Sequence, residues 1–357
     1  MTNKSLTAGL TRVRNLGLLP GVASGASPRR GGAIEQHLKA LGLKSLAIET
    51  ADRLLRPYIR YSPVQAGRQG AWAVYERCIR WRTPGSSRIA TTPFGFKVLI
   101  EQPTDTIQNS IWLTGRWEPV ITEFFRRTLA PGDTFVDVGA NIGYYSLLAS
   151  RLVTQTGRVY AIEASPTILR LLQGNITLNR ATNVEVIHAI AADREGEREF
   201  WLAPESNIGH STSVEMLART EGMRPEGRVR CGTLTSIVPA DQLLNARLIK
   251  IDVEGGERAV LESILDRLPE FSSRTVWAVE LSPSFCPGGQ ADVDWVFNEF
   301  CRRGYVAFSI KNGYSPGAYL SRPRSVDMEQ IMTAPVRLTD VLFFSGNNMG
   351  SDGASGL

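Results

Sequence analysis

Apolar residues in most of the chain follow two alternating periods. Short runs rich in β-branched and aromatic residues indicate buried strands, and between them apolar residues recur every three or four positions, as on one face of a helix. Strands that alternate with helices favour a mostly parallel sheet covered on both faces. Strands are predicted at 94–101, 134–138, 158–164, 184–192, 248–251, 276–281, 305–310 and 341–344, and helices at 119–129, 143–153, 257–268 and 292–303 and from 166 onward.

The first quarter of the chain has a different pattern. Residues 1–32 are rich in Gly, Ser, Pro and Arg and lack periodicity, so we expect a disordered basic tail. Residues 33–93 are predicted to form a helical N-terminal cap, in which Pro57 ends a helix. The main α/β domain is predicted at 94–346, with a disordered tail at 347–357.

Charge is uneven along the chain. Residues 1–90 carry 15 basic and 4 acidic side chains, whereas the whole chain has a net charge of +5. A basic arm can contact nucleic acid, anionic lipid or an acidic partner, or serve only as a solubilising extension. No aromatic-interleaved basic motif is present, so nucleic-acid binding is not favoured.

The sequence also limits the cellular setting. No apolar run reaches the roughly 18 residues that a membrane span needs, and the N-terminus lacks a signal-peptide pattern. Four widely spaced cysteines argue against a zinc site or a disulfide framework. We therefore expect a cytoplasmic protein without a membrane span.

The segment 133–143 combines a short strand, a turn of small residues and the start of a helix. Glycine in such a turn lets the backbone approach a ligand closely at a helix N-terminus. Glu163 lies at the end of the next predicted strand, where a carboxylate can accept hydrogen bonds from both hydroxyls of a ribose. Together these features predict a site for a nucleoside-containing cofactor.

The spacing within the turn distinguishes two cofactor classes. Dinucleotide-binding proteins usually have Gly-x-Gly-x-x-Gly, and here Tyr144 stands where the third glycine is expected. The observed pattern, Asp137-x-Gly139-x-Asn141-x-Gly143, looks more like the turn of methyltransferases that use S-adenosylmethionine. A nicotinamide-dependent oxidoreductase and a non-enzymatic nucleic-acid-binding protein are the alternatives.

Five segments taken together resemble one family. They are Asp137-Val-Gly-Ala-Asn-Ile-Gly-Tyr-Tyr-Ser146, Val159-Tyr-Ala-Ile-Glu-Ala-Ser-Pro166, Asn175 with Leu178-Asn179, Ala191-Ala-Asp-Arg-Glu-Gly196, and Leu248-Ile-Lys-Ile-Asp-Val-Glu-Gly255. Over about residues 94–345 the chain resembles the FkbM-type family of methyltransferases. The resemblance implies the class I Rossmann-like methyltransferase fold, with a mostly parallel seven-stranded sheet. It also implies S-adenosylmethionine as cofactor and O-methylation of a small-molecule or glycan hydroxyl.

The resemblance implies roles for individual residues as well. Glu163 would contact the ribose of the cofactor, and Asp252 would face the reacting methyl group. Two positions depart from the family pattern, because Ser282 stands where a histidine is common and Thr235 where an aspartate is common. The methionine end of the cofactor would be surrounded by Asp137, Gly139, Ala140, Asn141 and Gly143.

Three residues are candidates for the base that removes a hydroxyl proton: Asp252, Glu254 and His210. A carboxylate with an ordinary pKa near 4 is a weak base for an alcohol, so burial or coupling to the transfer step is required. His210 lies in a polar loop that either folds over the substrate or is exposed. Asp252 and Glu254 offer oxygen ligands for a cation, but no second ligand pair is evident, so no metal is predicted. We expect a small-molecule or sugar-bearing substrate, and the sequence leaves homo-oligomerisation open.

Overall fold

The computed structural model describes residues 43–79, 87–321, 323 and 325–348. The predicted tail at 1–32, the first part of the predicted cap and residues 349–357 lie outside this part. The chain divides into a small unit, residues 1–83 with 315–317, and a large unit, residues 84–314 with 318–357. Within the described residues, no helix has the length and apolar character needed to cross a membrane.

The described part of the small unit is helical. Helix α3 (Leu43–Thr50), a π-helical turn (Ala51–Leu55) and α4 (Arg56–Tyr61) follow one another directly, and α5 (Gln65–Ile79) comes next. The prediction that Pro57 ends a helix is wrong. Pro57 lies in the first turn of α4, directly after the π-helical turn, and the helical backbone continues through it.

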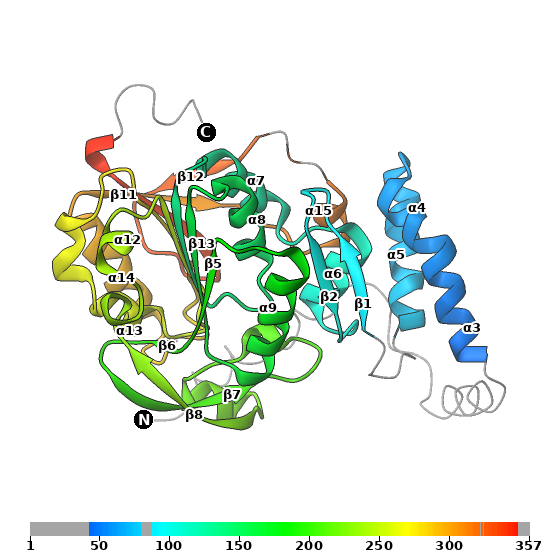
Figure 1. The fold of residues 1–357 in the computed structure, drawn as a ribbon, viewed down its shortest axis with the longest axis horizontal. Coiled ribbons are helices and arrows are strands. Elements are labelled where there is room, and N and C mark those ends of the chain that lie inside the picture. The colour runs from blue at the N-terminus through cyan, green and yellow to red at the C-terminus, as the bar shows by residue number, and fades with distance from the viewer. Residues whose placement is uncertain (1–42, 80–86, 322, 324, 349–357) are drawn as a thin grey trace, which may run out of the picture. The chain divides into compact units, whose positions relative to one another are not determined.

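An eight-stranded sheet organises the large unit (Figure 1), in the order β12-β11-β13-β10-β9-β3-β4-β5. The pairs from β5 to β10 are parallel, and β13 runs antiparallel to both of its neighbours. The chain fills one side of β3 first and then returns to its other side, so the carboxyl ends of β3 and β9 meet at the point where strand order reverses. The strands are β3 (Thr134–Val138), β4 (Arg158–Glu163), β5 (Val184–His188), β9 (Leu248–Ile251), β10 (Val276–Leu281), β11 (Tyr305–Ile310), β12 (Met328–Ile331) and β13 (Thr339–Ser345).

Helices cover both faces of this sheet, as predicted. Figure 1 shows α8 (Tyr144–Val153) and α9 (Pro166–Asn179) on one side, and α13 (Glu257–Glu262) and α14 (Gln290–Arg302) on the other. This architecture is the class I Rossmann-like methyltransferase fold that the resemblance implies. The expected seven strands are eight, because β12 adds a short polar edge strand that pairs with β11.

A buried aromatic cluster lies between the sheet and α14. Trp277 in β10, Phe300 in α14 and Phe343 in β13 have no exposed surface. The Phe300 and Phe343 rings are stacked, with centroids 4.2 Å apart. This apolar contact fixes α14 against β10 and β13, so the carboxyl end of β10 has a rigid support.

Two small sheets complete the large unit. Strands β1 (Arg88–Thr91) and β2 (Lys97–Ile100) form a hairpin, which begins inside the range predicted for the helical cap. The predicted strand 184–192 is divided after His188, because its last residues form β6 (Ile190–Ala191) of the other small sheet. That sheet also contains β7 (Gly196–Leu202) and β8 (Arg224–Gly232).

The remaining helices are α6 (Thr106–Thr114), α7 (Pro119–Thr128), α10 (Glu215–Thr220), α11 (Leu234–Ile237), α12 (Ala240–Leu244) and α15 (Pro316–Leu320), with 3₁₀ turns at Ile208–His210, Leu265–Glu270 and Gly346–Asn348.

Candidate active site

The turn after β3 brings three strand ends together. Gly139 has a φ of +81°, and the N–H groups of Gly139 and Ala140 both donate to the carbonyl oxygen of Ile162 in β4, at 3.0 and 2.9 Å. A Cβ atom on Gly139 would lie 1.8 Å from the carbonyl oxygen of Asp252, directly after β9. Only glycine satisfies both the conformation and the close approach. The turn therefore lies against the main chain of β4 and of Asp252.

Glu163, the last residue of β4, is held by main-chain donors. The N–H of Asn141 donates to its Oε2 and the N–H of Ser165 to its Oε1, each at 2.8 Å. Burial raises the pKa of Glu163 to about 7, although these backbone hydrogen bonds lower it. Each carboxylate oxygen keeps a lone pair for a further donor. The turn ends at Gly143, which has a φ of +86° and precedes α8.

Asn175 on α9 connects the turn to the β1–β2 hairpin. Its Nδ2 donates to the carbonyl oxygen of Ile142 at 2.8 Å, and its Oδ1 accepts from the N–H of Leu99 at 2.7 Å. Asn179, one helical turn later, binds the N–H and the carbonyl oxygen of Lys97 in the same way. Asn175 has no exposed surface. These two side chains, whose roles the sequence left open, build the hairpin onto α9.

Asp137 is fully buried at the same end of β3. Its Oδ2 accepts a hydrogen bond from the hydroxyl of Ser146 at 2.6 Å, whereas its buried Oδ1 has no hydrogen-bond partner among the described residues. Burial raises the pKa of Asp137, and the nearby ammonium of Lys250 opposes this shift. An unpaired buried acceptor of this kind suits an ammonium group or a bridging water.

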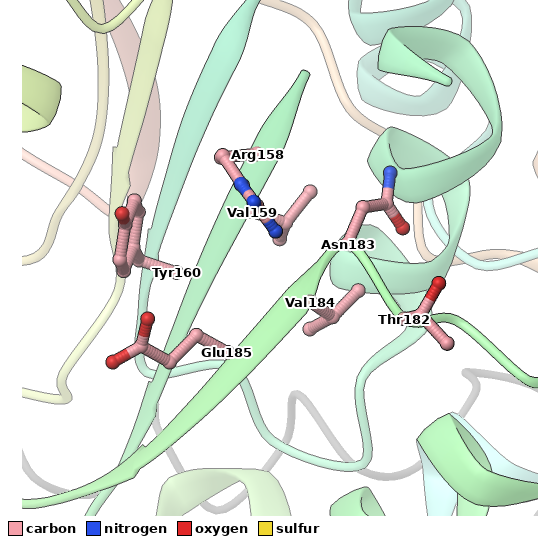
Figure 2. Close-up of a pocket in the computed structure, with 7 residues that line it drawn as sticks. All are labelled: Arg158, Val159, Tyr160, Thr182, Asn183, Val184 and Glu185. Atoms are coloured by element: carbon pink, nitrogen blue, oxygen red, sulfur yellow. The ribbon is translucent and has the colours of Figure 1, made fainter. Parts of the chain in front are cut away.

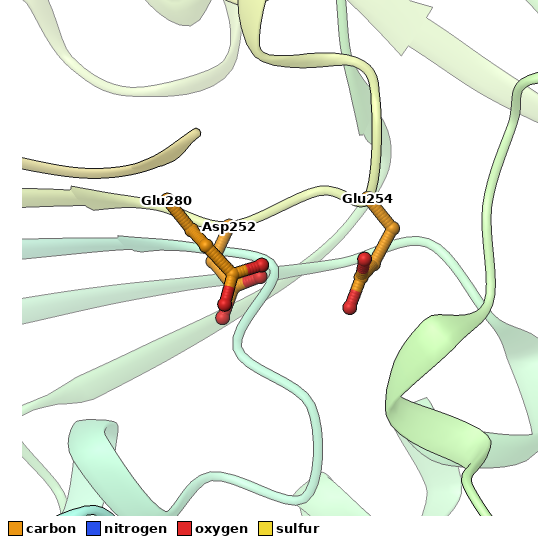
Figure 3. A group of neighbouring side chains, drawn as sticks. All are labelled: Asp252, Glu254 and Glu280. Carbon is orange, nitrogen blue, oxygen red and sulfur yellow. The ribbon is translucent and has the colours of Figure 1, made fainter. Parts of the chain in front are cut away.

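Three carboxylates converge beyond β9 and at the end of β10 (Figure 3). Asp252, Glu254 and Glu280 each offer an oxygen atom, and these atoms lie within 4.8 Å of one another. Lys250 donates from Nζ to Oδ2 of Asp252 at 2.8 Å. Burial, followed by repulsion from Asp252, raises the pKa values of Glu254 and Glu280 well above the usual range. We call these three residues the carboxylate cluster.

Two more carboxylates reach this region from distant parts of the chain. Glu118, just before α7, is buried and accepts hydrogen bonds from the hydroxyls of Tyr145 at 2.7 Å and Tyr314 at 2.9 Å. Asp340 in β13 is the register partner of Glu280. Burial raises the pKa of Glu118, and burial together with Glu118 raises that of Asp340. Sequence reasoning missed both residues, because only tertiary structure brings them to the site.

The loop that carries His210 is anchored at its base. The fully buried Asp105 caps α6 through the N–H of Gln108 at 2.9 Å and accepts the N–H of Ile208 at 3.0 Å. The His210 ring meets the Phe285 ring edge-on, with centroids 5.2 Å apart. Burial lowers the pKa of His210, and the carboxylate of Asp252 partly opposes this shift. His210 therefore lies within electrostatic range of Asp252 and is neutral near pH 7.

A separate pocket of about 380 Å³ is lined by residues 158–160 and 182–185 (Figure 2). It lies where β4 and β5 begin, at the amino ends of the strands. Ligands of parallel sheets bind at the opposite, carboxyl ends. We therefore assign this pocket no part in cofactor binding.

A comparison with protein families identifies the domain that contains the site. Residues 137–307, from Asp137 at the glycine turn through the carboxylate cluster, match the family model described as the methyltransferase FkbM domain. These residues form an FkbM-type methyltransferase domain. The cofactor of the FkbM family is S-adenosylmethionine, and the domain match thus favours methyl transfer over the nicotinamide-dependent alternative.

Two curated proteins resemble this chain in sequence. The 31-O-demethyl-FK506 methyltransferase FkbM of Streptomyces tacrolimicus is 29% identical over 162 residues, or 39% of this chain and 62% of that protein. A protein-L-isoaspartate O-methyltransferase of Aeropyrum pernix is 46% identical over 46 residues, or 13% of this chain and 18% of that protein. The chain thus spans less than two thirds of the length of either relative.

Solved structures of methyltransferases are also similar. A putative O-methyltransferase from Klebsiella pneumoniae has 12% sequence identity and a TM-score of 0.39, covering 78% of this chain and 98% of that one. Fibrillarin from Aeropyrum pernix, in complex with natively bound S-adenosyl-L-methionine, has 12% identity and a TM-score of 0.33, covering 74% of this chain and 84% of that one.

Proposed function

We propose that this protein transfers the methyl group of S-adenosylmethionine to a hydroxyl group of a small molecule or a sugar-bearing metabolite. The observation that carries the proposal is the contact of the glycine turn with both Glu163 and Asp252. At the carboxyl ends of adjacent strands, the FkbM domain offers bare backbone, a buried carboxylate and a partly exposed acid. The name of the Streptomyces tacrolimicus relative describes O-methyl chemistry in that protein, which supports oxygen as the acceptor atom here.

The residues of the turn fit the cofactor at three points. The unpaired Oδ1 of Asp137 would receive the ammonium of the methionine part, directly or through water. The main chain from Gly139 to Gly143, together with Ala140 and Asn141, would surround the rest of that part. Glu163 would accept the ribose hydroxyls with its remaining lone pairs. When bound, S-adenosylmethionine supplies a methyl group activated by a sulfonium centre.

Removal of the hydroxyl proton from the acceptor would fall to His210 or to Asp252. His210 is neutral near pH 7, so its imidazole has a free lone pair with which to accept that proton. Asp252 would stabilise the resulting imidazolium, because the two groups already interact electrostatically. The pKa of Glu254 is raised well above the usual range, so this carboxyl group tends to keep its proton. Glu254 is therefore less suited than His210 or Asp252 to act as the base.

Calorimetric titration with S-adenosylhomocysteine tests this proposal, with NAD as the control ligand. We expect micromolar affinity for S-adenosylhomocysteine, about −8 kcal/mol, and no heat with NAD. Binding of NAD alone, or of neither ligand, would overturn the proposal. Transfer of labelled methyl groups from S-adenosylmethionine to a panel of hydroxyl and amine acceptors would then decide between O- and N-methylation.

A further inference from the structure

We propose that Asp252, Glu254 and Glu280 form a binding site for one divalent cation that prefers oxygen ligands, such as Mg²⁺ or Mn²⁺. Figure 3 shows the three carboxylates facing one another from two neighbouring strand ends. Their ligand atoms lie within 4.8 Å of one another. Oxygen ligands at about 2.0–2.6 Å from a cation are separated by at most about 5 Å across it, so the observed cluster needs little rearrangement.

Glu254 provides an independent indication of a ligand. Its side chain is 8% exposed, and its Oε2 is buried without a hydrogen-bond partner in the described part of the chain. The neighbouring Glu257 instead satisfies its carboxylate with the N–H groups of Val253 and Gly255. A buried carboxylate oxygen without a donor is costly unless a proton, a cation or a water binds it. Because the Glu254 carboxylate belongs to the carboxylate cluster, a shared cation would bind that carboxylate.

The charge of the cluster suits a divalent ion. A bound cation would displace the protons that Glu254 and Glu280 otherwise keep, so the three carboxylates would then carry three negative charges, and the ammonium of Lys250 on Asp252 offsets one of them. The two negative charges that remain would balance the two positive charges of Mg²⁺ or Mn²⁺. Glu118 and Asp340 also repel the carboxylate cluster electrostatically. Their negative charges therefore favour the binding of a cation.

A cation could enter this site from solvent. The Asp252 side chain is 31% exposed, and Glu280 is partly exposed. Because Asp252 also lies against the glycine turn, a cation here would be held beside the cofactor site, where it would bind a hydroxyl or carbonyl oxygen of the acceptor. This last role depends on the proposed methyl transfer, whereas cation binding itself does not.

The test is a titration of the full-length, chelator-treated protein with Mn²⁺, followed by electron paramagnetic resonance, with Mg²⁺ as competitor. We expect one Mn²⁺ per chain, displaced by Mg²⁺. The variants Glu254→Gln and Glu280→Gln should each weaken Mn²⁺ binding by about tenfold or more. Glu197→Gln is the control, because Glu197 is a 60% exposed carboxylate on β7 outside the cluster, and it should bind Mn²⁺ like the unaltered protein.

Two outcomes would overturn the site. One is the absence of saturable Mn²⁺ binding to the unaltered protein at millimolar concentrations, and the other is unchanged affinity in either folded glutamine variant. Thermal unfolding establishes which variants are folded, and the two substitutions are independent, so one folded variant is enough. Titration of S-adenosylhomocysteine into chelated protein reports on the cofactor site separately, which distinguishes failure of the cation site from failure of the proposed function.

Discussion

The main-chain N–H of Asn141 donates to Oε2 of Glu163 at 2.8 Å, so the conformation of the glycine turn is coupled to the charge of a buried carboxyl group. The pKa of Glu163 is raised to about 7. A carboxylate accepts more hydrogen bonds than a neutral carboxylic acid. Protonation of Glu163 would therefore weaken both its bond to the turn and its capacity to hold a ribose.

Cofactor affinity should rise with pH. At pH 6 about one tenth of Glu163 would be ionised, so the dissociation constant of S-adenosylhomocysteine should be about tenfold higher than at pH 8. Calorimetry across this range measures the effect. The Glu163→Gln variant should bind more weakly, by about 1–3 kcal/mol, with little dependence on pH. Wild-type affinity in that variant would contradict the ribose assignment.

Substitution of Gly139 should be far more damaging than substitution of another glycine with positive φ. In Gly139→Ala the new Cβ would meet the Asp252 carbonyl oxygen at 1.8 Å, so we expect a loss of about 3 kcal/mol or more in the free energy of unfolding. Gly95 has a φ of +85° but no atom within 4 Å of its would-be Cβ. Gly95→Ala should therefore cost only about 1–2 kcal/mol. Urea unfolding compares the two, and equal losses would show that the contact with Asp252 is unimportant.

Asn175→Ala should affect both stability and cofactor binding. It leaves the Leu99 N–H and the Ile142 carbonyl without their partner, which costs about 1–3 kcal/mol for each buried group. Asn183 is a matched control, because it is also buried and donates a hydrogen bond to the main chain of Ser150 at the other end of the sheet. Both variants should lower the melting temperature. Only Asn175→Ala should weaken S-adenosylhomocysteine binding. Equal binding by both variants would show that the link between the hairpin and the glycine turn does not contribute to cofactor affinity.

His210→Gln should slow methyl transfer without changing cofactor affinity. Loss of a general base costs about 10²–10⁴-fold in rate. Because the pKa of His210 is lowered from 6.5, the rate of the unaltered protein at saturating S-adenosylmethionine should fall only at pH values below 6.5, where the imidazole becomes protonated. The exposed His188 on β5 serves as the control residue. Undiminished turnover in His210→Gln would leave Asp252 as the base.

The sequence predicted best those elements whose apolar pattern determines their structure. The buried strands β3, β9 and β10 lie at the predicted residues, and α9 begins at Pro166, as predicted. The strand β8 escaped prediction because its Pro225 and Gly227 indicate a turn, whereas pairing with β7 keeps it extended across a bulge. The extended conformation of β8 thus depends on its pairing with β7, which the local sequence pattern does not encode.

The residues of the candidate site also fall into those that the local pattern reveals and those that only tertiary structure brings to the site. Glu163 and Asp252 could be found because they end predicted strands, and the structure brings both to the turn. Glu118 could not, since it precedes a helix and reaches the site only through its hydrogen bonds with Tyr145 and Tyr314. Asp340 comes from a strand paired with β10 about sixty residues later. Glu118 and Asp340 thus reach the site through long-range contacts, which the spacing of residues along the sequence does not reveal.

The place of β13 in the sheet has a consequence for how the protein is made. The FkbM match ends at residue 307, yet β13 at Thr339–Ser345 lies between β10 and β11 and bonds to both. During synthesis, β10 and β11 must leave the ribosome before the strand that joins them exists. Until then both have unpaired edges, which favour aggregation of a growing chain. The sheet that carries Glu280 is complete only when this late strand is inserted, so residues 137–307 of this chain lack a strand that pairs with two of their own.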